Sequence, residues 1–400
     1  MTSSKNAAAP IDGKPEPVLA AERLAWLVEA RADEIEASRF LPQEIADAFA
    51  QAGLYRLFVP AAYGGFEANP LALVETIERV ARGDASAAWC AFIGATSGIV
   101  AAFLAPENAR EIFGDPLTIT AGVFAPRGTA KRETQDGVPG YRVSGRWQWG
   151  SGSRNASWIM GGALILGEDG KPEMMDGGGT KSRMMIFPAH EVSLLDTWHV
   201  SGLAGTGSTD FEVRDVFVPQ GRSVSFTNDT PLARPLYCFP TFGLLGIGIA
   251  AVALGIARGA IDDMLDLAGG KTPQGSSKPL ALRAKTQIDV SEAEVLTRSA
   301  RAYLVETIGA AWEAASREGA ISIAHRRDIR LATTHATRAA ARAVDLMYTL
   351  GGGTSVYRRS TLQRRFRDIH VATQHMMVSE ATLELTGRLF LGVPADTAML

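Results

Sequence analysis

Apolar side chains recur at helical spacing in the first quarter of the chain. Residues three or four positions apart share one face of a helix, so this spacing predicts amphipathic helices. Five apolar residues follow it: Leu24, Leu27, Val28, Ala32 and Ile35. The segment LPQEIADAFAQAG also has a proline where a helix begins and a glycine where one ends. The pattern predicts an N-terminal helical domain over residues 17–116.

From residue 117 the pattern changes to short runs in which apolar and polar residues alternate. Four such runs stand between glycine-rich turns: YRVSGRWQW, WIMGGALIL, RMMIFP and DFEVRDVFVP. Alternation with a period of two is typical of strands that bury one face. We therefore expect a central β-domain over residues 117–230.

The remainder of the chain, residues 231–400, is helical again. A periodic segment without proline runs from Arg283 to Gly319 and predicts a long helix. The longest apolar run, Tyr237–Ala257, holds several glycines and Pro240. We expect it to be a buried helix rather than a membrane span. The fold class is thus α+β, with a helical domain on each side of the β-domain.

The first residues and the cysteines bear on the location of the protein. Residues 1–16 are polar, contain proline and glycine, and lack the apolar core of a signal peptide, so they predict a disordered tail. Cys90 and Cys238 lie far apart in apolar surroundings, which is typical of buried thiols in a reducing compartment. We expect a cytoplasmic protein that is not held in a membrane.

Composition narrows the possible partners. An apolar content of 46% with 21% charged residues is that of a globular protein with a large core. The net charge of −3 and the absence of a basic stripe argue against binding to nucleic acid. Five arginines do cluster near the C-terminus, either on a solvated helix face or at a phosphate or subunit contact: Arg358, Arg359, Arg364, Arg365 and Arg367.

Most common site motifs are missing. The segment GIGIAA fits a dinucleotide fingerprint but has no strand before it, so we interpret its glycines as helix-packing positions. The six histidines include no H-E-x-x-H pair. His370 and His375 are five residues apart and would point in different directions from a helix, so no metal site is expected.

Three glycine-containing segments remain as candidates for a ligand site. WQWGSGSRNASW, residues 147–158, places Ser151 between two glycines and among three tryptophans. WHVSGLAGTGSTDFEVRDVFVP passes from a glycine-rich loop into a strand, and LGGGTSVYRRSTLQRRFRDIH has three glycines ahead of an arginine-rich helix. Glycines let backbone amides approach a ligand closely, although each loop could also be a tight connection.

Together these segments resemble the acyl-CoA dehydrogenase superfamily. LFVPAAYGGFEANPLALVETIERVARGDASAAW is similar to its N-terminal signature, GRWQWGSG to the segment along the flavin, and GTGSTDFEVRDVFVP and LGGGTSVYRRSTLQRRFRDIH to later motifs. The likeness covers about residues 20–395. It implies an N-terminal helical domain, a central β-barrel, a C-terminal four-helix bundle and a homotetramer in which neighbouring subunits complete the flavin site.

The carboxylate base of the dehydrogenases is missing at both of its usual positions. In one branch it follows Arg367 by nine residues, where Met376 stands here, and no acid lies between Asp368 and Glu380. In the other branch it lies on the first C-terminal helix, but there is no acid from Thr230 to Ile261. His375 stands in this region instead, a pattern that resembles the two-component flavin-dependent monooxygenases of the same fold.

That resemblance implies a set of site residues. Ser151 would lie at the reactive N5/C4a edge of the flavin and His375 across the pocket, unless each has only a structural role. Trp149, Gly152, Arg283 and the glycines Gly351, Gly352 and Gly353 would contact the cofactor. Trp89, Phe92 and Trp158 would line the substrate pocket with His375.

We therefore predict a monooxygenase that receives FADH2 or FMNH2 from a separate NAD(P)H:flavin reductase. It would react with O2 to give a C4a-hydroperoxyflavin and hydroxylate a small aromatic or heteroaromatic substrate. A neutral serine and a histidine that titrates near neutrality suit that chemistry. The helix ASAAWCAFIGATSG lacks a histidine that several phenol hydroxylases carry, which leaves indoles and N- or S-oxidation open. A dehydrogenase with a displaced base and a non-catalytic scaffold are the alternatives.

Overall fold

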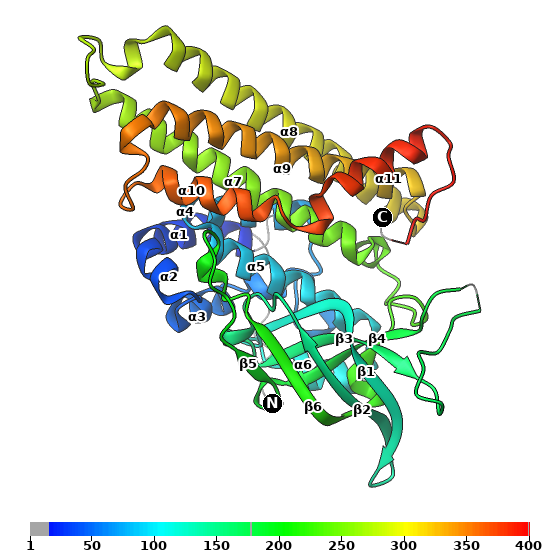
Figure 1. Cartoon of the computed structure of the whole chain (residues 1–400). Helices are drawn as coiled ribbons and strands as arrows, with labels where there is room; N and C mark the ends of the chain where they lie inside the picture. The colour runs from blue at the N-terminus through cyan, green and yellow to red at the C-terminus, as the bar shows by residue number, and fades with distance from the viewer. Residues whose placement is uncertain (1–15, 177, 399) are drawn as a thin grey trace, which may run out of the picture.

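The computed structural model of the protein describes residues 16–176, 178–398 and 400. It has three regions in the predicted order, helices, strands and helices (Figure 1). The predicted tail, residues 1–16, lies outside the described residues except for Glu16, at which the first helix begins.

The N-terminal region consists of six helices. They are α1 (Glu16–Ala30), α2 (Ala32–Ser38), α3 (Gln43–Gln51), α4 (Pro70–Gly83), α5 (Ala85–Ser97) and α6 (Pro106–Phe113). Helix α5 begins at Asp84, whose carboxylate accepts a 2.8 Å hydrogen bond from the Ala87 amide as an N-cap. Nearly every side chain of α5 is buried, because it packs against α7 on one side and against β1 and the turn at residues 204–206 on the other.

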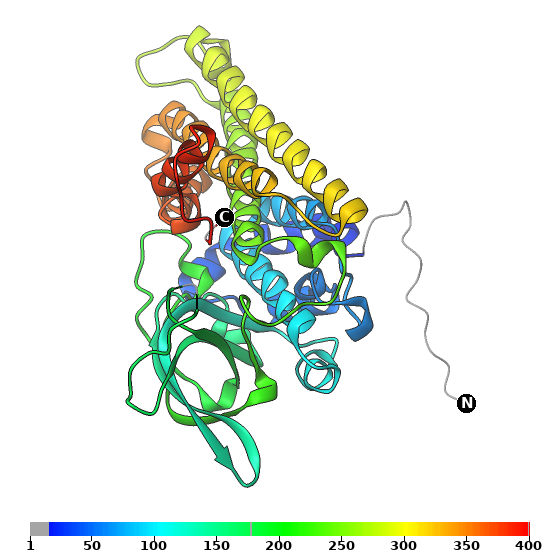
Figure 2. The same ribbon diagram turned by 90° about the vertical axis from the view of Figure 1, so that its right-hand side faces the viewer.

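The central region is one seven-stranded sheet. Its strands are β1 (Thr120–Gln135), β2 (Val138–Trp147), β3 (Trp158–Leu166), β4 (Ser182–Pro188), β5 (Ser193–Leu195), β6 (Asp210–Pro219) and β7 (Ser223–Val224). The order is β5-β6-β2-β1-β3-β4-β7, and only β1 and β3 pair in parallel. The sheet curves round as an open barrel with β5 and β7 at its edges (Figure 2).

Trp147 fills the inside of this sheet. Its ring is fully buried and stacks on Phe211 with centroids 5.1 Å apart. A side-chain carbon at Gly145 or Gly161 would lie 2.6 or 2.5 Å from the indole, so both positions must lack one. The first tryptophan of WQWGSGSRNASW is therefore a core residue of the β-domain.

The C-terminal region holds α7 (Thr241–Gly270), α8 (Ala284–Glu318), α9 (Ile323–Gly351), α10 (Thr361–Ala372) and α11 (Glu380–Phe390). Helix α8 confirms the long helix predicted from Arg283 to Gly319. Two segments are long and apolar enough to span a membrane, α7 and residues 85–103, but 94% and 89% of their most apolar windows are buried inside the protein. Both are therefore core helices of this fold.

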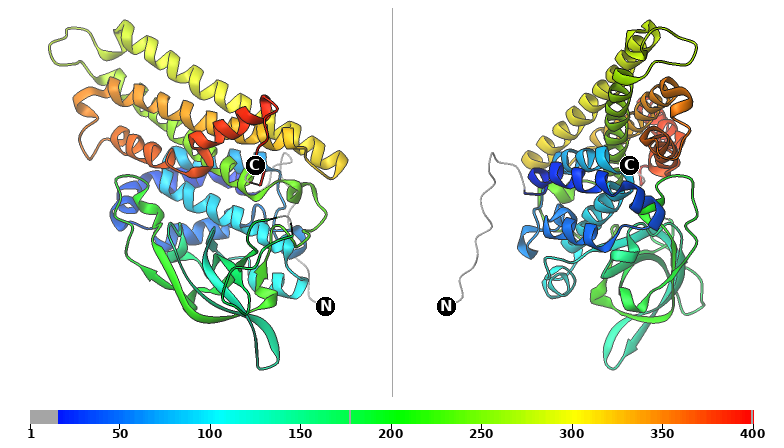
Figure 3. Two further views of the ribbon diagram at one scale, coloured as in Figure 1. Left: turned by 45° about the vertical axis from the view of Figure 1, so that its right-hand side comes forward. Right: turned by 90° about the vertical axis from the view of Figure 1, so that its left-hand side faces the viewer.

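Three of the clustered arginines form ion pairs with α2 and α7. Arg364 pairs with Asp33 and Glu36 of α2, and Arg365 pairs with Asp263 of α7 at 2.6 Å. Arg367 pairs with Glu36 at 2.6 Å. These three are neither a solvated face nor free for a phosphate, since they hold the N-terminal helices against the bundle. The N-terminal helices lie between the sheet and the bundle (Figure 3).

Candidate active site

Ser151 lies in a tight turn directly after β2. The turn has left-handed backbone at Trp149 (φ 66°) and at Gly152 (φ 72°). Its amides are tied to the loop before β6, because Gly150 N–H donates to Thr209 O at 2.9 Å and Gly152 N–H to Thr206 O at 3.0 Å. The two glycines thus let the turn follow the neighbouring loop, and Ser151 is only 6% exposed.

A chain of hydroxyl groups begins at Ser151. Trp89 Nε1 lies 3.1 Å from Ser151 Oγ, and Ser151 Oγ lies 2.6 Å from Ser208 Oγ. Ser208 Oγ lies 2.6 Å from Thr206 Oγ1, which donates to the Leu203 carbonyl at 2.8 Å. An indole N–H can only donate and a carbonyl can only accept, so both ends orient every proton toward Leu203. Ser151 therefore keeps a lone pair, not a proton, for a ligand.

Helix α5 supplies the aromatic part of the site. Trp89 packs edge-on against Phe92, with ring centroids 4.9 Å apart. Phe92 in turn lies against α7, where a side-chain carbon at Gly248 would come within 2.4 Å of its ring. Trp89 thus contacts Ser151, and Phe92 packs against Trp89 and α7, while the substrate-pocket role that the sequence assigned to both stays a prediction.

His375 approaches the same tryptophan from the C-terminal region. The imidazole centroid lies 5.9 Å from that of the Trp89 ring, at an interplanar angle of 55°. The Nδ1 atom accepts a 3.2 Å hydrogen bond from the Met377 amide, so in the neutral ring the proton is on Nε2. Burial, and then the nearby charge of Arg330, lowers the pKa of His375 to about 4. A neutral Nε2–H donor therefore remains for a ligand.

Arg330 is a buried cation next to this histidine, and it was not identified from the sequence. The side chain is 3% exposed, and burial lowers its pKa to about 10. Its Nη1 donates to the Met377 sulfur at 3.3 Å, while Nε has no hydrogen-bond partner among the described residues. Helix α7 leaves room for the guanidinium at Gly246, where a side-chain carbon would lie 3.3 Å from Nη1.

The acids that flank His375 in the sequence are engaged elsewhere. Asp368 is buried and accepts a 2.6 Å hydrogen bond from the Leu203 amide. Burial and the neighbouring Asp84 raise the pKa of Asp368 to about 7. Glu380 pairs with Arg338 at 2.9 Å on the outer surface. Neither carboxylate takes the place of the missing dehydrogenase base.

The other two tryptophans of the segment WQWGSGSRNASW, Trp149 and Trp158, differ in their surroundings. Trp149 is 65% exposed although it lies two residues from buried Ser151. Trp158 is half-buried in a separate apolar cluster with Met160, and the Arg222 guanidinium lies 5.1 Å from its ring. An exposed indole at Trp149 leaves a flat surface for a cofactor, whereas a pocket role for Trp158 stays a prediction.

The remaining cofactor residues lie at the far end of the bundle. Arg283 is exposed immediately before α8, and Lys271 Nζ links the neighbouring loop to the Gly351 carbonyl at 2.6 Å. The α7–α8 and α9–α10 connections both lie at the end of the bundle away from the sheet (Figure 1). The cofactor role of Arg283 and Gly351–Gly353 stays a prediction.

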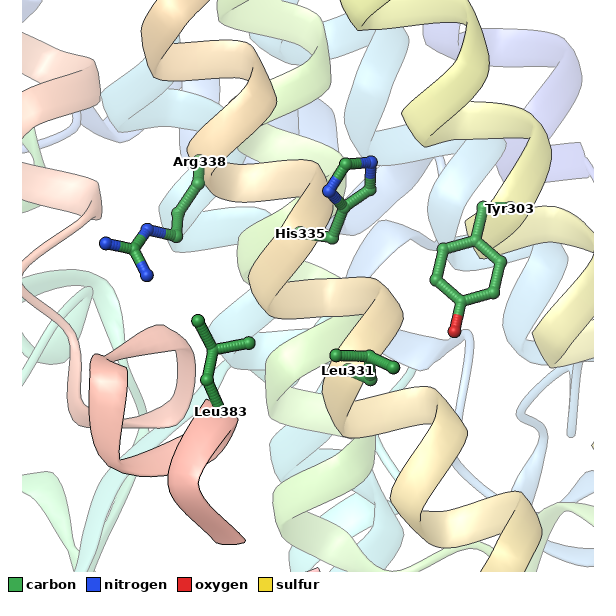
Figure 4. Close-up of a pocket in the computed structure, with 5 residues that line it drawn as sticks. All are labelled: Tyr303, Leu331, His335, Arg338 and Leu383. Atoms are coloured by element: carbon green, nitrogen blue, oxygen red, sulfur yellow. The ribbon is translucent and has the colours of Figure 1, made fainter. Parts of the chain in front are cut away.

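A pocket on the outer face of α9 is separate from these residues. It is lined by Tyr303, Leu331, His335, Arg338 and Leu383 from α8, α9 and α11 (Figure 4). Ser151 and His375 are not among its lining residues. Across the described ranges, no group of three His, Cys, Asp or Glu residues could hold a metal ion.

Sequence reasoning missed Ser208, Thr206 and Arg330. The first two occur in GTGSTDFEV, which was recognised for its glycines, but only the antiparallel pairing of Trp147 with Phe211 brings that loop beside Ser151. Nothing in the sequence separates Arg330 from the other arginines of α9.

Comparisons with known proteins agree with this architecture. Residues 20–108 match the family model described as acyl-CoA dehydrogenase, N-terminal domain, and residues 247–380 that of the C-terminal domain. The chain is 34% identical over 365 residues to indole-3-acetate monooxygenase of Pseudomonas putida, covering 91% of this chain and 90% of that protein. It is 28% identical to the oxygenase component of FADH(2)-dependent resorcinol hydroxylase of Rhizobium sp., covering 92% of each chain.

A solved structure is similar over nearly the same length. XiaF from Streptomyces sp. in complex with FADH2 and glycerol superposes with a TM-score of 0.85 and 25% identity, covering 95% of this chain and 97% of that one.

Proposed function

The chain belongs to the acyl-CoA dehydrogenase family, among its flavin-dependent monooxygenases, and from that premise we propose that it hydroxylates an aromatic acid of the indole-3-acetate type. The relative at 34% identity, named for indole-3-acetate, supports the choice of substrate. The predicted fold and the monooxygenase branch are confirmed, while the substrate is our proposal.

One observation carries the functional assignment. Trp89 donates a hydrogen bond to Ser151 and packs against His375, so residues from all three regions of the chain meet at one indole. A hydroxyl acceptor on one side and an imidazole donor on the other suit an oxygen-transfer site. The two positions of the dehydrogenase base carry no acid.

The residues around Ser151 fit a bound flavin. Trp149 offers an exposed ring, and the left-handed Gly152 keeps the turn free of a side chain. When bound, reduced flavin supplies two electrons to O2, so that one oxygen atom enters the substrate and the other leaves as water. Ser151 would accept a hydrogen bond from the N–H at the reactive edge, since its own proton is directed to Ser208.

The other residues bind and shield the reactants. His375 would donate from Nε2 to an oxygen of the substrate or of the oxidant, because its neutral form is the stable one above about pH 5. Trp89 and Phe92 would exclude water from the reacting ring. Exclusion of water favours oxygen transfer over wasteful release of hydrogen peroxide.

The assembly and the location follow from the same proposal. The chain has no nicotinamide fingerprint, so a separate NAD(P)H:flavin reductase would supply FADH2 or FMNH2, as expected for an oxygenase component. The loops that hold Arg283 and Gly351–Gly353 lie at the end of the bundle away from the sheet, which supports a homotetramer whose subunits share flavin sites. The free cysteines Cys90 and Cys238 support a cytoplasmic protein.

Rapid mixing with oxygen tests the function. The protein with one equivalent of reduced FAD or FMN is mixed with O2 and indole-3-acetate, and flavin absorbance and product are followed. We expect a transient flavin spectrum before oxidised flavin returns, and a hydroxylated product. Rapid oxidation with stoichiometric hydrogen peroxide for every aromatic compound tried, together with reduction of bound FAD by an acyl-CoA, would favour a dehydrogenase instead.

A further inference from the structure

Arg330 is a buried cation that has no ion-pair partner among the described residues. It lies on α9 against α7, and α7 has no acidic residue before Asp262. Asp328, the acid nearest to Arg330 in the sequence, pairs with Arg327, and Glu380, three residues after Met377, pairs with Arg338. A buried charge without a partner destabilises the folded protein, because the charge loses its hydration and gains no attraction in exchange. Such a cost is typical of a residue kept for binding.

The only polar contact of the guanidinium among the described residues is a poor one. Nη1 donates to the thioether of Met377, a weak acceptor, and Nε has no partner. A guanidinium has five N–H groups in a plane and matches a carboxylate with two parallel hydrogen bonds. The N–H groups of Arg330 that have no good acceptor thus match the geometry of a planar anion such as a carboxylate.

Met377 lies between this cation and His375. Its amide donates to His375 Nδ1, and its sulfur accepts from Arg330 Nη1. The sequence of contacts is Ser151, Trp89, His375, Met377 and Arg330. Met377 therefore contacts both the imidazole of His375 and the guanidinium of Arg330.

We infer that Arg330 binds the carboxylate of the substrate, so that the enzyme selects aromatic acids over neutral aromatic compounds of the same shape. The inference rests on the monooxygenase function proposed above, and adds a binding residue and the requirement that the substrate has a negative charge. A ring lying against Trp89 and His375 would have its acid group at Arg330 and its reacting carbon toward Ser151. The thioether contact would be exchanged for two charged hydrogen bonds.

Binding of a matched acid and amide tests the inference without turnover. Indole-3-acetate and indole-3-acetamide differ only in the charged group, and their dissociation constants are measured anaerobically with reduced flavin bound. We expect wild-type protein to bind the acid at least about 30-fold more tightly, as for a buried charge pair. Equal affinity for acid and amide in the wild type would overturn the inference, whatever the variants do.

Two variants and a control locate the effect. R330M should lose about 30-fold or more in affinity for the acid while affinity for the amide changes less than about 3-fold, and R330K should fall between. R338M, two turns further along α9 on its outer face, should bind both ligands as the wild type does. An equal loss for both ligands in R330M would mean that Arg330 only supports the fold.

A thermal scan separates these outcomes further. R330M should melt no lower than the wild type, because an unpaired buried cation is replaced by an apolar side chain. At equal concentration the acid should raise the melting temperature of the wild type more than the amide does, and this difference should be lost in R330M. If the wild type hydroxylates neutral indoles as well as acids, this inference fails while the proposed function stands; if no aromatic compound is hydroxylated, the proposed function itself fails.

Discussion

The indole N–H of Trp89 donates a 3.1 Å hydrogen bond to the hydroxyl of Ser151, and so joins the N-terminal helices to the β-domain at the site. The hydroxyl chain that begins at Ser151 ends at the Leu203 carbonyl, which can only accept, so Ser151 donates its own proton to Ser208, 2.6 Å away. The protein thus fixes the direction in which the Ser151 O–H group points before a ligand binds. A hydroxyl that accepts a hydrogen bond from an N–H group, and directs its own proton elsewhere, is suited to contact a reduced flavin.

Trp89→Phe should weaken oxygen transfer more than folding. The variant keeps an aromatic ring beside His375 but leaves the Ser151 hydroxyl held by Ser208 alone. We expect product per reduced flavin to fall about 10-fold, with peroxide rising in its place, and stability to fall by about 1 kcal/mol for one lost hydrogen bond. Trp26→Phe, at a tryptophan 69% exposed on α1, is the control and should change neither. Unchanged coupling in Trp89→Phe would remove the Trp89–Ser151 bond from the mechanism.

Ser208→Ala tests the direction of the hydroxyl chain. Without Ser208 the Ser151 hydroxyl loses its acceptor and can turn its proton to the ligand. We expect reduced flavin to bind with little change, while coupling of flavin oxidation to product falls several-fold, in the same direction as for Ser151→Ala. Ser225→Ala removes an equally buried hydroxyl outside the site and should leave coupling intact. Equal coupling in Ser208→Ala and wild type would show that the chain does not orient Ser151.

His375 should stay neutral across the working range. Burial and the charge of Arg330 lower its pKa to about 4, so a folded protein binds fewer protons at this residue than an unfolded one between about pH 4 and 6.5. The stability that this residue contributes is present above about pH 6.5 and is lost as the pH falls toward 4. Histidine NMR titration should show the low pKa, and R330M should raise it while R338M leaves it in place. A normal pKa in the wild type would contradict the enclosed imidazole described here.

The sequence predicted the order of the regions because local patterns carry it, and a local pattern also marks the glycine-flanked segment at Ser151. Alternating residues mark β2, and the left-handed turn after it needs glycine at position 152. Trp147 and Trp149, two residues apart, have opposite environments, one in the sheet core and one exposed. Side chains two residues apart in a strand point to the same face, so Trp149 differs from Trp147 only because the strand has already ended in a turn. The alternating pattern alone does not say where that turn begins.

Long-range contacts account for what the sequence did not predict. Ser208 meets Ser151 through the pairing of β2 with β6, and Arg330 becomes the buried arginine of α9 only where α7 and Met377 cover it. The arginine-rich helix α10 shows the same limit. Its arginines suited a solvated face as well as a phosphate or subunit contact, and their partners are Glu36 on α2 and Asp263 on α7, both far away in the sequence.

Asp368→Asn should stabilise the protein in a pH-dependent way. Burial, and then the charge of Asp84, raises the pKa of Asp368 to about 7, so the folded protein holds a proton there that the unfolded chain releases above about pH 4. Stability from this group is therefore present at low pH and is lost as the pH rises toward 7. Asparagine is neutral throughout and can still accept the hydrogen bond from the Leu203 amide. By urea unfolding, the variant should gain up to about 4 kcal/mol relative to wild type at about pH 8 and little at about pH 4. A difference independent of pH, or a loss of stability at the higher pH, would mean that Asp368 is ionised and paired in the folded state.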